Sequence, residues 1–298
     1  MSRLRDALDV GTFVVTAELG PPVEPTADPV RETARRFAPI VHAANVTDNQ
    51  AATVKLSPLA CSVWMMEEGL EPLMQITARD RNLLALQADL LGAWALGVRS
   101  VLALSGDPLK VGPYEGIANA RSDVDSTGLI KLVAGLNEGR LAAGEELSAP
   151  PDFLIATAAN PLVDTAERLA GKLDAGAHCF QTNIVYDVDR FSEWFSGMVD
   201  AGIPQRGPMI VGVTPPRGTR GLRYMHEKIP GIEVDDATFA RMEGLEGEEA
   251  RREGVAIAVD VVRRLRELPH VSGVHIMAPG WEAEAVPAVV EGAGLTLA

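Results

Sequence analysis

Short, continuously apolar stretches alternate along the chain with longer segments whose apolar residues recur at helical spacing. Residues 100–109 show this most clearly: positions 101–104 are all apolar, which is typical of a strand buried on both faces, and the run stops at Gly106, Asp107 and Pro108. The preceding residues 82–97 carry leucines and a tryptophan at helical spacing and end on a glycine, a common helix stop. We therefore predict a helix, then a buried strand with a carboxylate at its carboxyl end.

The same unit recurs along the whole chain. Buried strands are predicted at residues 12–19, 42–46, 72–77, 101–104, 153–159, 179–187, 209–213 and 273–277, with helices between them. Their number and spacing favour an α/β fold, a (β/α)8 TIM barrel formed by one domain over residues 1–298. A doubly wound open sheet is the alternative, but no G-x-G-x-x-G follows the first strand.

Composition narrows the class of protein. The chain has 298 residues, of which 47% are hydrophobic, enough to fill one barrel-sized core. A net charge of −14 argues against nucleic-acid and anionic-membrane partners. No apolar run approaches the roughly 18 residues of a membrane span, so we expect a cytoplasmic protein. The two cysteines, Cys61 and Cys179, lack metal or disulfide spacing and are predicted to be small buried hydrophobes.

Polar residues follow most of the predicted strands, and in parallel α/β folds chemistry gathers at that end. Glu18 and Asp107 are the carboxylates there. Burying a carboxyl is unfavourable unless it is paired or functional, so a structural salt bridge for Glu18 and a turn cap for Asp107 remain the alternatives. No histidine falls at these ends, which disfavours an imidazole metal site, and Ser105 has no base partner in sequence. These residues favour acid–base chemistry without a metal.

The predicted strand at residues 179–187 carries unusual polarity for a buried strand. By alternation Gln181, Asn183 and Val185 share one of its faces. Two amides on one face need hydrogen-bond partners, which the interior or mouth of a barrel can supply.

Eight motifs, in the same order along the chain, resemble those of the 5,10-methylenetetrahydrofolate reductase family. They are VTAELGPP, NVTDN, QITARDRN, LALSGDP, SDVDSTGLI, QTNIVYD, GVTPPRG and HIMAPGWE. The chain is most similar to the short, catalytic-domain form of the acetogen-type branch. This resemblance implies a TIM barrel in which NADH or NADPH reduces a flavin, and the flavin reduces 5,10-methylenetetrahydrofolate to 5-methyltetrahydrofolate.

The resemblance also assigns roles to individual residues. Glu18 matches the family's general acid, which protonates N10 of the folate, so burial is expected to raise its pKa. Asp107 matches the aspartate beside pterin and flavin. The implied folate contacts are Thr47, Asn49, Gln181 and Asn183. The implied flavin contacts are Thr47, Thr77, Asp80, Asp107, Asp125, Ser126, Asn160 and Lys172.

Some of these positions have simpler interpretations. Asp125 or Ser126 also suits the N-cap of the following helix, and Lys172, the candidate partner of the flavin phosphate, equally suits a solvated helix position. The chain departs from the family where Asn183 replaces a second glutamine and Ser105 replaces an arginine.

The resemblance leaves the cofactor and assembly open. FAD is the first expectation, with FMN or no flavin as alternatives. Without flavin, hydride would pass directly from the nicotinamide, and the same barrel could instead be a folate- or flavin-binding subunit that acts with a partner chain. A homo-oligomer is also compatible with the sequence.

Overall fold

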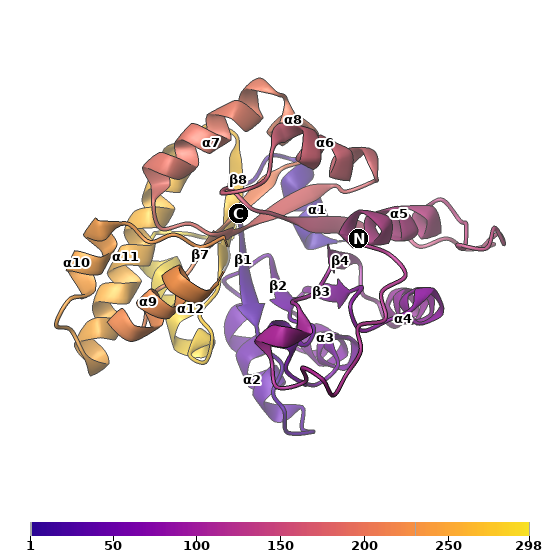
Figure 1. The fold of residues 1–298 in the computed structure, drawn as a ribbon, viewed down its shortest axis with the longest axis horizontal. Helices are drawn as coiled ribbons and strands as arrows, with labels where there is room; N and C mark the ends of the chain where they lie inside the picture. The colour runs from indigo at the N-terminus through magenta and orange to yellow at the C-terminus, as the bar shows by residue number, and fades with distance from the viewer. Residues whose placement is uncertain (1, 230, 298) are drawn as a thin grey trace.

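Eight parallel strands close into a barrel in which each strand pairs with its neighbours in sequence and β8 pairs with β1. The computed structural model describes residues 2–229 and 231–297. The strands are β1 (Val14–Leu19), β2 (Ala43–Val46), β3 (Pro72–Thr77), β4 (Ser100–Leu104), β5 (Leu154–Ala159), β6 (Cys179–Ile184), β7 (Met209–Val213) and β8 (Val271–Ile276). The predicted (β/α)8 barrel is confirmed (Figure 1).

Helices surround the strands and connect them (Figure 1). They are α1 (Arg3–Asp9), α2 (Asp28–Phe37), α3 (Pro58–Glu67), α4 (Leu83–Leu96), α5 (Ser126–Asn137), α6 (Ala166–Asp174), α7 (Val188–Asp200), α8 (Ile203–Arg206), α9 (Thr219–Lys228), α10 (Asp236–Met242), α11 (Gly247–Glu267) and α12 (Glu282–Gly292). Two 3-10 turns, η1 (Gln50–Ala52) and η2 (Leu109–Val111), follow β2 and β4.

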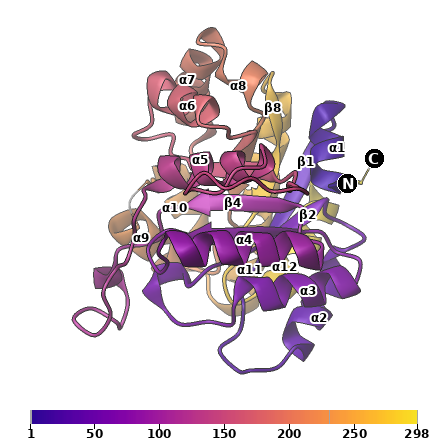
Figure 2. The ribbon, with the colours of Figure 1, turned by 90° about the vertical axis from the view of Figure 1, so that its right-hand side faces the viewer.

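The period-two alternation of each strand sorts its residues between two cores. Outward side chains of β1 and β2, such as Val15 and Val46, pack against the helices, while those of β3 and β4 join a second outer cluster. Inward side chains fill the barrel, which α1 closes at one end by inserting Leu4 and Leu8. The β4–α5 connection extends from the opposite end, where the strands have their carboxyl termini (Figure 2).

Several boundary predictions are wrong. The strand predicted to reach residue 187 ends at Ile184, because its pairing with β7 shifts register after Gln181. Val185 then packs in the outer cluster instead of sharing a face with Gln181 and Asn183. The sequence also predicts Thr26 or Asp28 as the N-cap of the helix after β1, but the N-cap of α2 is Ala27, which makes no side-chain hydrogen bond. These are errors in local chain geometry that leave the topology unchanged.

Three helices, α1, α8 and α9, have no counterpart in the sequence-based prediction, and α8 lies between α7 and β7. The amino-terminal residues form α1, and the arginine-rich segment after β7 forms α9. The sequence pattern predicts a helix over residues 253–268, whereas α11 begins earlier, at Gly247. Together α9, α10 and the start of α11 enclose a small apolar cluster that includes Tyr186 and Leu222.

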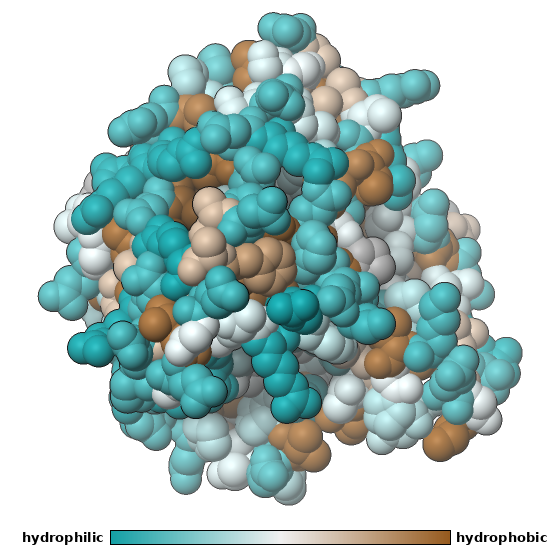
Figure 3. Space-filling view, turned by 60° about the vertical axis from the view of Figure 1, so that its left-hand side comes forward, coloured by the Kyte–Doolittle hydropathy of each residue, from teal (hydrophilic) through white to brown (hydrophobic). Residues whose placement is uncertain are grey.

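The surface agrees with the acidic composition. Figure 3 shows a face on which hydrophilic residues predominate and hydrophobic ones are scattered in small groups. Among the helices of the described ranges, none combines the length and apolar character needed to span a bilayer. Both cysteines are buried and free, as expected.

Candidate active site at the carboxyl ends of the strands

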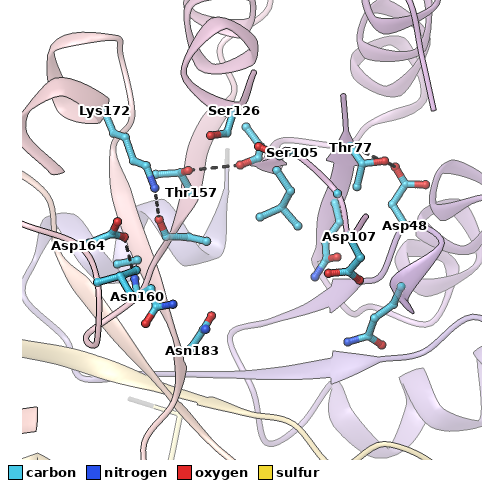
Figure 4. Close-up of a pocket in the computed structure, with 18 of the residues that line it drawn as sticks. Asp48, Thr77, Ser105, Asp107, Ser126, Thr157, Asn160, Asp164, Lys172 and Asn183 are labelled. Atoms are coloured by element: carbon cyan, nitrogen blue, oxygen red, sulfur yellow. Dashed lines mark hydrogen bonds between the residues drawn. The ribbon is translucent and has the colours of Figure 1, made fainter. Parts of the chain in front are cut away.

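A cavity of about 440 Å³ opens at the carboxyl ends of β3 to β6. Six of the predicted site residues line it: Thr77, Asp107, Ser126, Asn160, Lys172 and Asn183. Figure 4 shows these side chains around one space, with Asp48, Thr77 and Asp107 on one side and Lys172, Asp164 and Asn160 on the other. A second cavity of about 520 Å³ adjoins it, shares Asp107 with it and has Asp125 in its wall.

Glu18 is the penultimate residue of β1 and is only 4% exposed. Three neighbours from other elements act on its carboxyl: Gln50 by a side-chain hydrogen bond, Glu282 and Asp107 by their charge. Burial, reinforced by the charges of Glu282 and Asp107, raises the pKa of Glu18 from 4.5 to about 7, and the hydrogen bond from Gln50 opposes this. Glu18 therefore sits where a carboxyl can hold a proton near neutral pH.

Asp107 holds the loop that follows β2 by a hydrogen bond. Its Oδ2 accepts a hydrogen bond from the backbone N–H of Ala51 at 2.7 Å. Gly106 brings the chain to this position, since its φ of +88° favours glycine and a Cβ there would lie 2.9 Å from the Cβ of Arg79. Asp107 is thus a cavity-lining carboxylate with one oxygen already engaged by the protein.

Arg79, which is buried, and Arg81, which is partly exposed, hold together the loops after β2, β3 and β4. Arg79 pairs with both carboxylate oxygens of the adjacent Asp80 through Nε and Nη2, and it donates to the backbone oxygens of Asn49 and Asp107 at 3.2 and 2.9 Å. Arg81 pairs with Asp48 at 2.5 Å. Burial alone would raise the pKa of Asp80, but hydrogen bonds from Arg79 and Asn49, together with the charge of Arg79, lower it. The Asp80 carboxylate thus holds the Arg79 guanidinium in place.

Asp48 links Arg81 to the cavity wall. Its Oδ2 also accepts hydrogen bonds from the backbone N–H and the hydroxyl of Thr77, at 2.8 and 2.9 Å (Figure 4). The side chain is buried, so the ion pair with Arg81 and these two bonds satisfy a charge that would otherwise be costly.

Lys172 forms the opposite side of the cavity. It is 7% exposed and donates to the backbone oxygen of Ala158 at 2.5 Å. Burial lowers the pKa of Lys172, while the charge of Asp164 acts in the other direction. The solvated position considered for Lys172 is therefore wrong. Among the residues described, no carboxylate lies within ion-pair distance of it, which leaves a buried cation facing the cavity.

A polar layer crosses the barrel interior beneath the mouth. The Asn45 amide donates to Gln181 at 2.7 Å, and Gln181 in turn donates to Asn45 at 3.2 Å and to Thr16 at 3.4 Å. Thr16 also hydrogen-bonds Nδ1 of His275 at 3.0 Å. The interior thus supplies a partner for Gln181, as expected, and Asn183 lies at the cavity.

The remaining predicted residues lie around the cavity but not in its wall. Thr47 is buried after β2, and Asn49 hydrogen-bonds Asp80 and the Lys55 backbone. Asp125 is the N-cap of α5, accepting from the N–H of Gly128, which settles the choice between Asp125 and Ser126.

Sequence reasoning assigns no role to four residues that shape the site, Asp48, Gln50, Arg79 and Glu282, although Asp48 is expected at the strand ends. Asp48 and Arg79 stand in the motifs at the ends of β2 and β3, Gln50 comes directly after the first of these motifs, and Glu282 ends the motif at the end of β8. Their position directly after strand ends was the available signal.

The fold and the cavity define a class: a (β/α)8 barrel with a polar cavity at the carboxyl ends of its strands. The family model described as methylenetetrahydrofolate reductase matches residues 3–294. The chain belongs to that family.

Sequence relatives agree with this assignment. Methylenetetrahydrofolate reductase 1 of Schizosaccharomyces pombe is 26% identical over 225 residues, covering 71% of this chain. Methylenetetrahydrofolate reductase 2 of Saccharomyces cerevisiae is 26% identical over 215 residues, covering 70%. The chain's match spans about a third, 34%, of the length of each yeast protein.

A solved structure shares the fold. An uncharacterized protein from Clostridium thermocellum that binds two copies of 5-methyl-5,6,7,8-tetrahydrofolic acid superposes with a TM-score of 0.68. The two chains are 15% identical, and the match covers 98% of each.

Proposed function

We propose that this chain reduces 5,10-methylenetetrahydrofolate to 5-methyltetrahydrofolate, with NADH or NADPH as the hydride source and FAD as the flavin. The observation that carries the proposal is Glu18, a buried carboxyl with a pKa of about 7 at a strand end, in a chain of this family. The folate bound by the Clostridium thermocellum protein of the same fold supports a folate substrate.

Glu18 would supply the proton that opens the substrate. The methylene bridge joins N5 and N10 of the folate, and protonation of N10 lets the C–N10 bond break to leave a cationic iminium at N5. An ordinary glutamate is ionised at neutral pH, whereas a carboxyl with a pKa of about 7 is about half protonated. The negative charge of Asp107 at the cavity would stabilise the iminium cation.

The cavity residues fit a flavin. Lys172 presents a buried cation without a carboxylate ion pair in the described ranges, a setting suited to a phosphate group. Thr77, Ser126 and Asn160 add hydroxyl and amide groups to the same wall. When bound, a flavin supplies hydride transfer from the nicotinamide to the methylene carbon. Gln181, Asn183, Thr47 and Asn49 are the proposed folate contacts.

We also propose where the protein acts, what it binds and that it acts as one domain. The acidic charge and the two free, buried cysteines support a cytoplasmic protein whose partners are small molecules, with residues 1–298 acting as one domain.

The absorption spectrum of the purified protein, reconstituted with FAD, tests the proposal. A flavin band that NADH or NADPH bleaches without oxygen, and that 5,10-methylenetetrahydrofolate restores, is the expected result. A protein that stays colourless with FAD and with FMN would overturn the flavin route and favour direct hydride transfer. A flavin band that neither nicotinamide bleaches would contradict independent activity and indicate a partner chain.

A further inference from the structure

Two amide side chains of the cavity wall meet at one point of the loop between α9 and α10, which is described at residues 229 and 231–235. Asn160 follows β5 and Asn183 lies on β6, and both line the cavity, where Figure 4 shows them side by side. A Cβ on Gly231, in this loop, would lie 2.2 Å from Nδ2 of Asn160 and 2.4 Å from Nδ2 of Asn183. The loop backbone therefore lies directly against both amides, at a distance that only glycine permits.

These contacts orient the two amides. Nδ2 of Asn183 donates to the backbone oxygen of Gly231 at 3.5 Å, so the NH2 end of this amide faces the loop. Oδ1 of Asn160 accepts from the Leu162 N–H at 3.0 Å, which leaves the NH2 end of Asn160 turned toward Gly231 as well. An asparagine amide donates at one end and accepts at the other, so its orientation decides which edge of a ligand it can bind.

Contacts with α7, with α9 and with an apolar cluster hold the loop in this position. Glu233 forms an ion pair with Arg190 of α7, and the Val234 N–H donates to Nδ1 of His226 on α9 at 3.2 Å. Ile232 and Val234 are buried in the cluster that α9, α10 and the start of α11 enclose. The position of the loop backbone is therefore set by the packing around the loop, and the amides adapt to it.

Backbone conformation alone does not account for the contacts of this glycine. Gly231 has a φ of +88°, and Gly244, between α10 and α11, has a φ of +75°, so both lie in the left-handed region that favours glycine. Among the residues described, nothing apart from its chain neighbours would lie within 4 Å of a Cβ on Gly244. Gly244 thus shares the backbone conformation of Gly231 without the contacts, and a comparison of the two positions separates these effects.

We propose that Gly231 is a positioning residue, whose backbone holds the amides of Asn160 and Asn183 in the orientation in which they meet ligands of the cavity. Asn160 is a proposed flavin contact and Asn183 a proposed folate contact, so the identity of the ligands rests on the proposed function. The pterin ring of a folate has an edge of C=O and N–H groups, which an amide of fixed orientation can match. A side chain at position 231 would turn or displace both amides, because the ends of two side chains move more readily than the packed loop.

The positions of the two amides can be measured in the free protein, before any ligand is added. Their side-chain N–H signals in a ¹H–¹⁵N spectrum are identified by their loss in Asn160→Asp and in Asn183→Asp. We expect Gly231→Ala to move both pairs of signals, whereas Gly244→Ala, the matched control, should leave them in place. Unmoved signals in Gly231→Ala, or equal movement in the control, would overturn the inference.

Binding of 5-methyltetrahydrofolate, titrated by calorimetry, tests the consequence for a ligand. We expect Gly231→Ala to weaken binding by about 10-fold, the effect of losing one hydrogen bond, and Gly244→Ala to leave it unchanged. In an Asn183→Ala background, Gly231→Ala should weaken binding no further, since Gly231 acts through that amide. Additive losses would show that Gly231 has only a structural effect and would overturn its positioning role.

The two measurements separate this inference from the proposed function. A wild type that binds no folate contradicts the proposed function, while the amide signals of the free protein still decide whether the loop holds the two amides.

A second variant keeps the test open if Gly231→Ala fails to fold. Glu233→Gln removes the ion pair with Arg190 that anchors the loop, so the same amide signals must move. Glu227→Gln is its control, because it removes an exposed carboxylate of α9 that has no ion pair among the described residues, and it should leave the signals in place. Unmoved signals in Glu233→Gln would then overturn the inference.

Discussion

Replacing Glu18 by glutamine should change how the stability of the protein depends on pH. Glutamine keeps the shape of the side chain and removes the ionisation. In the folded wild type, burial raises the pKa of Glu18 from 4.5 to about 7, so the native state holds this proton to a higher pH than the unfolded chain does. Since the native state binds more protons, the free energy of unfolding must fall as pH rises through that window.

The size of the effect follows from the raised pKa. A difference between 4.5 and about 7 corresponds to about 3 kcal/mol, at 1.36 kcal/mol for each pKa unit. This stability is fully present below about pH 4.5 and is lost by the time pH passes about 7, where the protein must keep a buried carboxylate charged. Because the side chain is 4% exposed, solvent screening reduces the value little.

Urea unfolding of wild type and Glu18→Gln at matched pH values between 4.5 and 8.5 measures the difference. Subtracting the two curves cancels the other titrating groups, to the extent that these do not interact with Glu18. We expect the glutamine variant to gain about 3 kcal/mol relative to wild type across this range. Parallel curves, with a difference that does not change with pH, would refute a raised pKa for Glu18.

Three further substitutions test the supports of the site. Lys172→Met should weaken flavin binding by about 10- to 100-fold in a fluorescence-quenching titration, because it removes the buried cation. Lys131→Met, on the exposed face of α5, is the control and should leave the affinity unchanged. Equal flavin affinities in the two variants would show that Lys172 does not contact the flavin. Gly112→Ala should lower the free energy of unfolding by about 1 to 3 kcal/mol, since its Cβ would lie 2.4 Å from a backbone oxygen, and a neutral effect in urea would argue against this packing. Asp48→Ala should destabilise by about 1 to 3 kcal/mol in the same assay, since it removes the buried acceptor of Arg81 and of the Thr77 N–H and hydroxyl while Arg81 keeps its pair with Asp89, and no loss would contradict that role.

The barrel could be predicted from the sequence because each strand is marked twice. It is a short apolar run, and it ends at a polar or turn-forming residue, as at Gly106 after β4. The same logic placed Glu18 and Asp107 at strand ends. Alternation along β6 also directed Gln181 toward the interior, where Asn45 now pairs with it.

What the sequence did not reveal depends on contacts between loops that are distant along the chain. The pairing shift that ends β6 at Ile184 is set by β7, and the left-handed turn at Ala51 persists because Asp107 and Arg79 hold it. Glu282 meets the end of β1 only because the barrel closes β8 onto β1. The spacing of apolar residues along the chain does not predict these contacts.

We propose that this chain forms 5-methyltetrahydrofolate with Glu18 as the proton donor. The most direct measurement is anaerobic product formation, followed by mass spectrometry, with wild type and Glu18→Gln each given 5,10-methylenetetrahydrofolate, FAD or FMN, and NADH or NADPH. We predict product from wild type and a rate lower by about 10²- to 10⁴-fold in the variant, the usual contribution of a positioned acid. Equal rates in the two proteins, or no product from wild type under any of these combinations, would contradict the account.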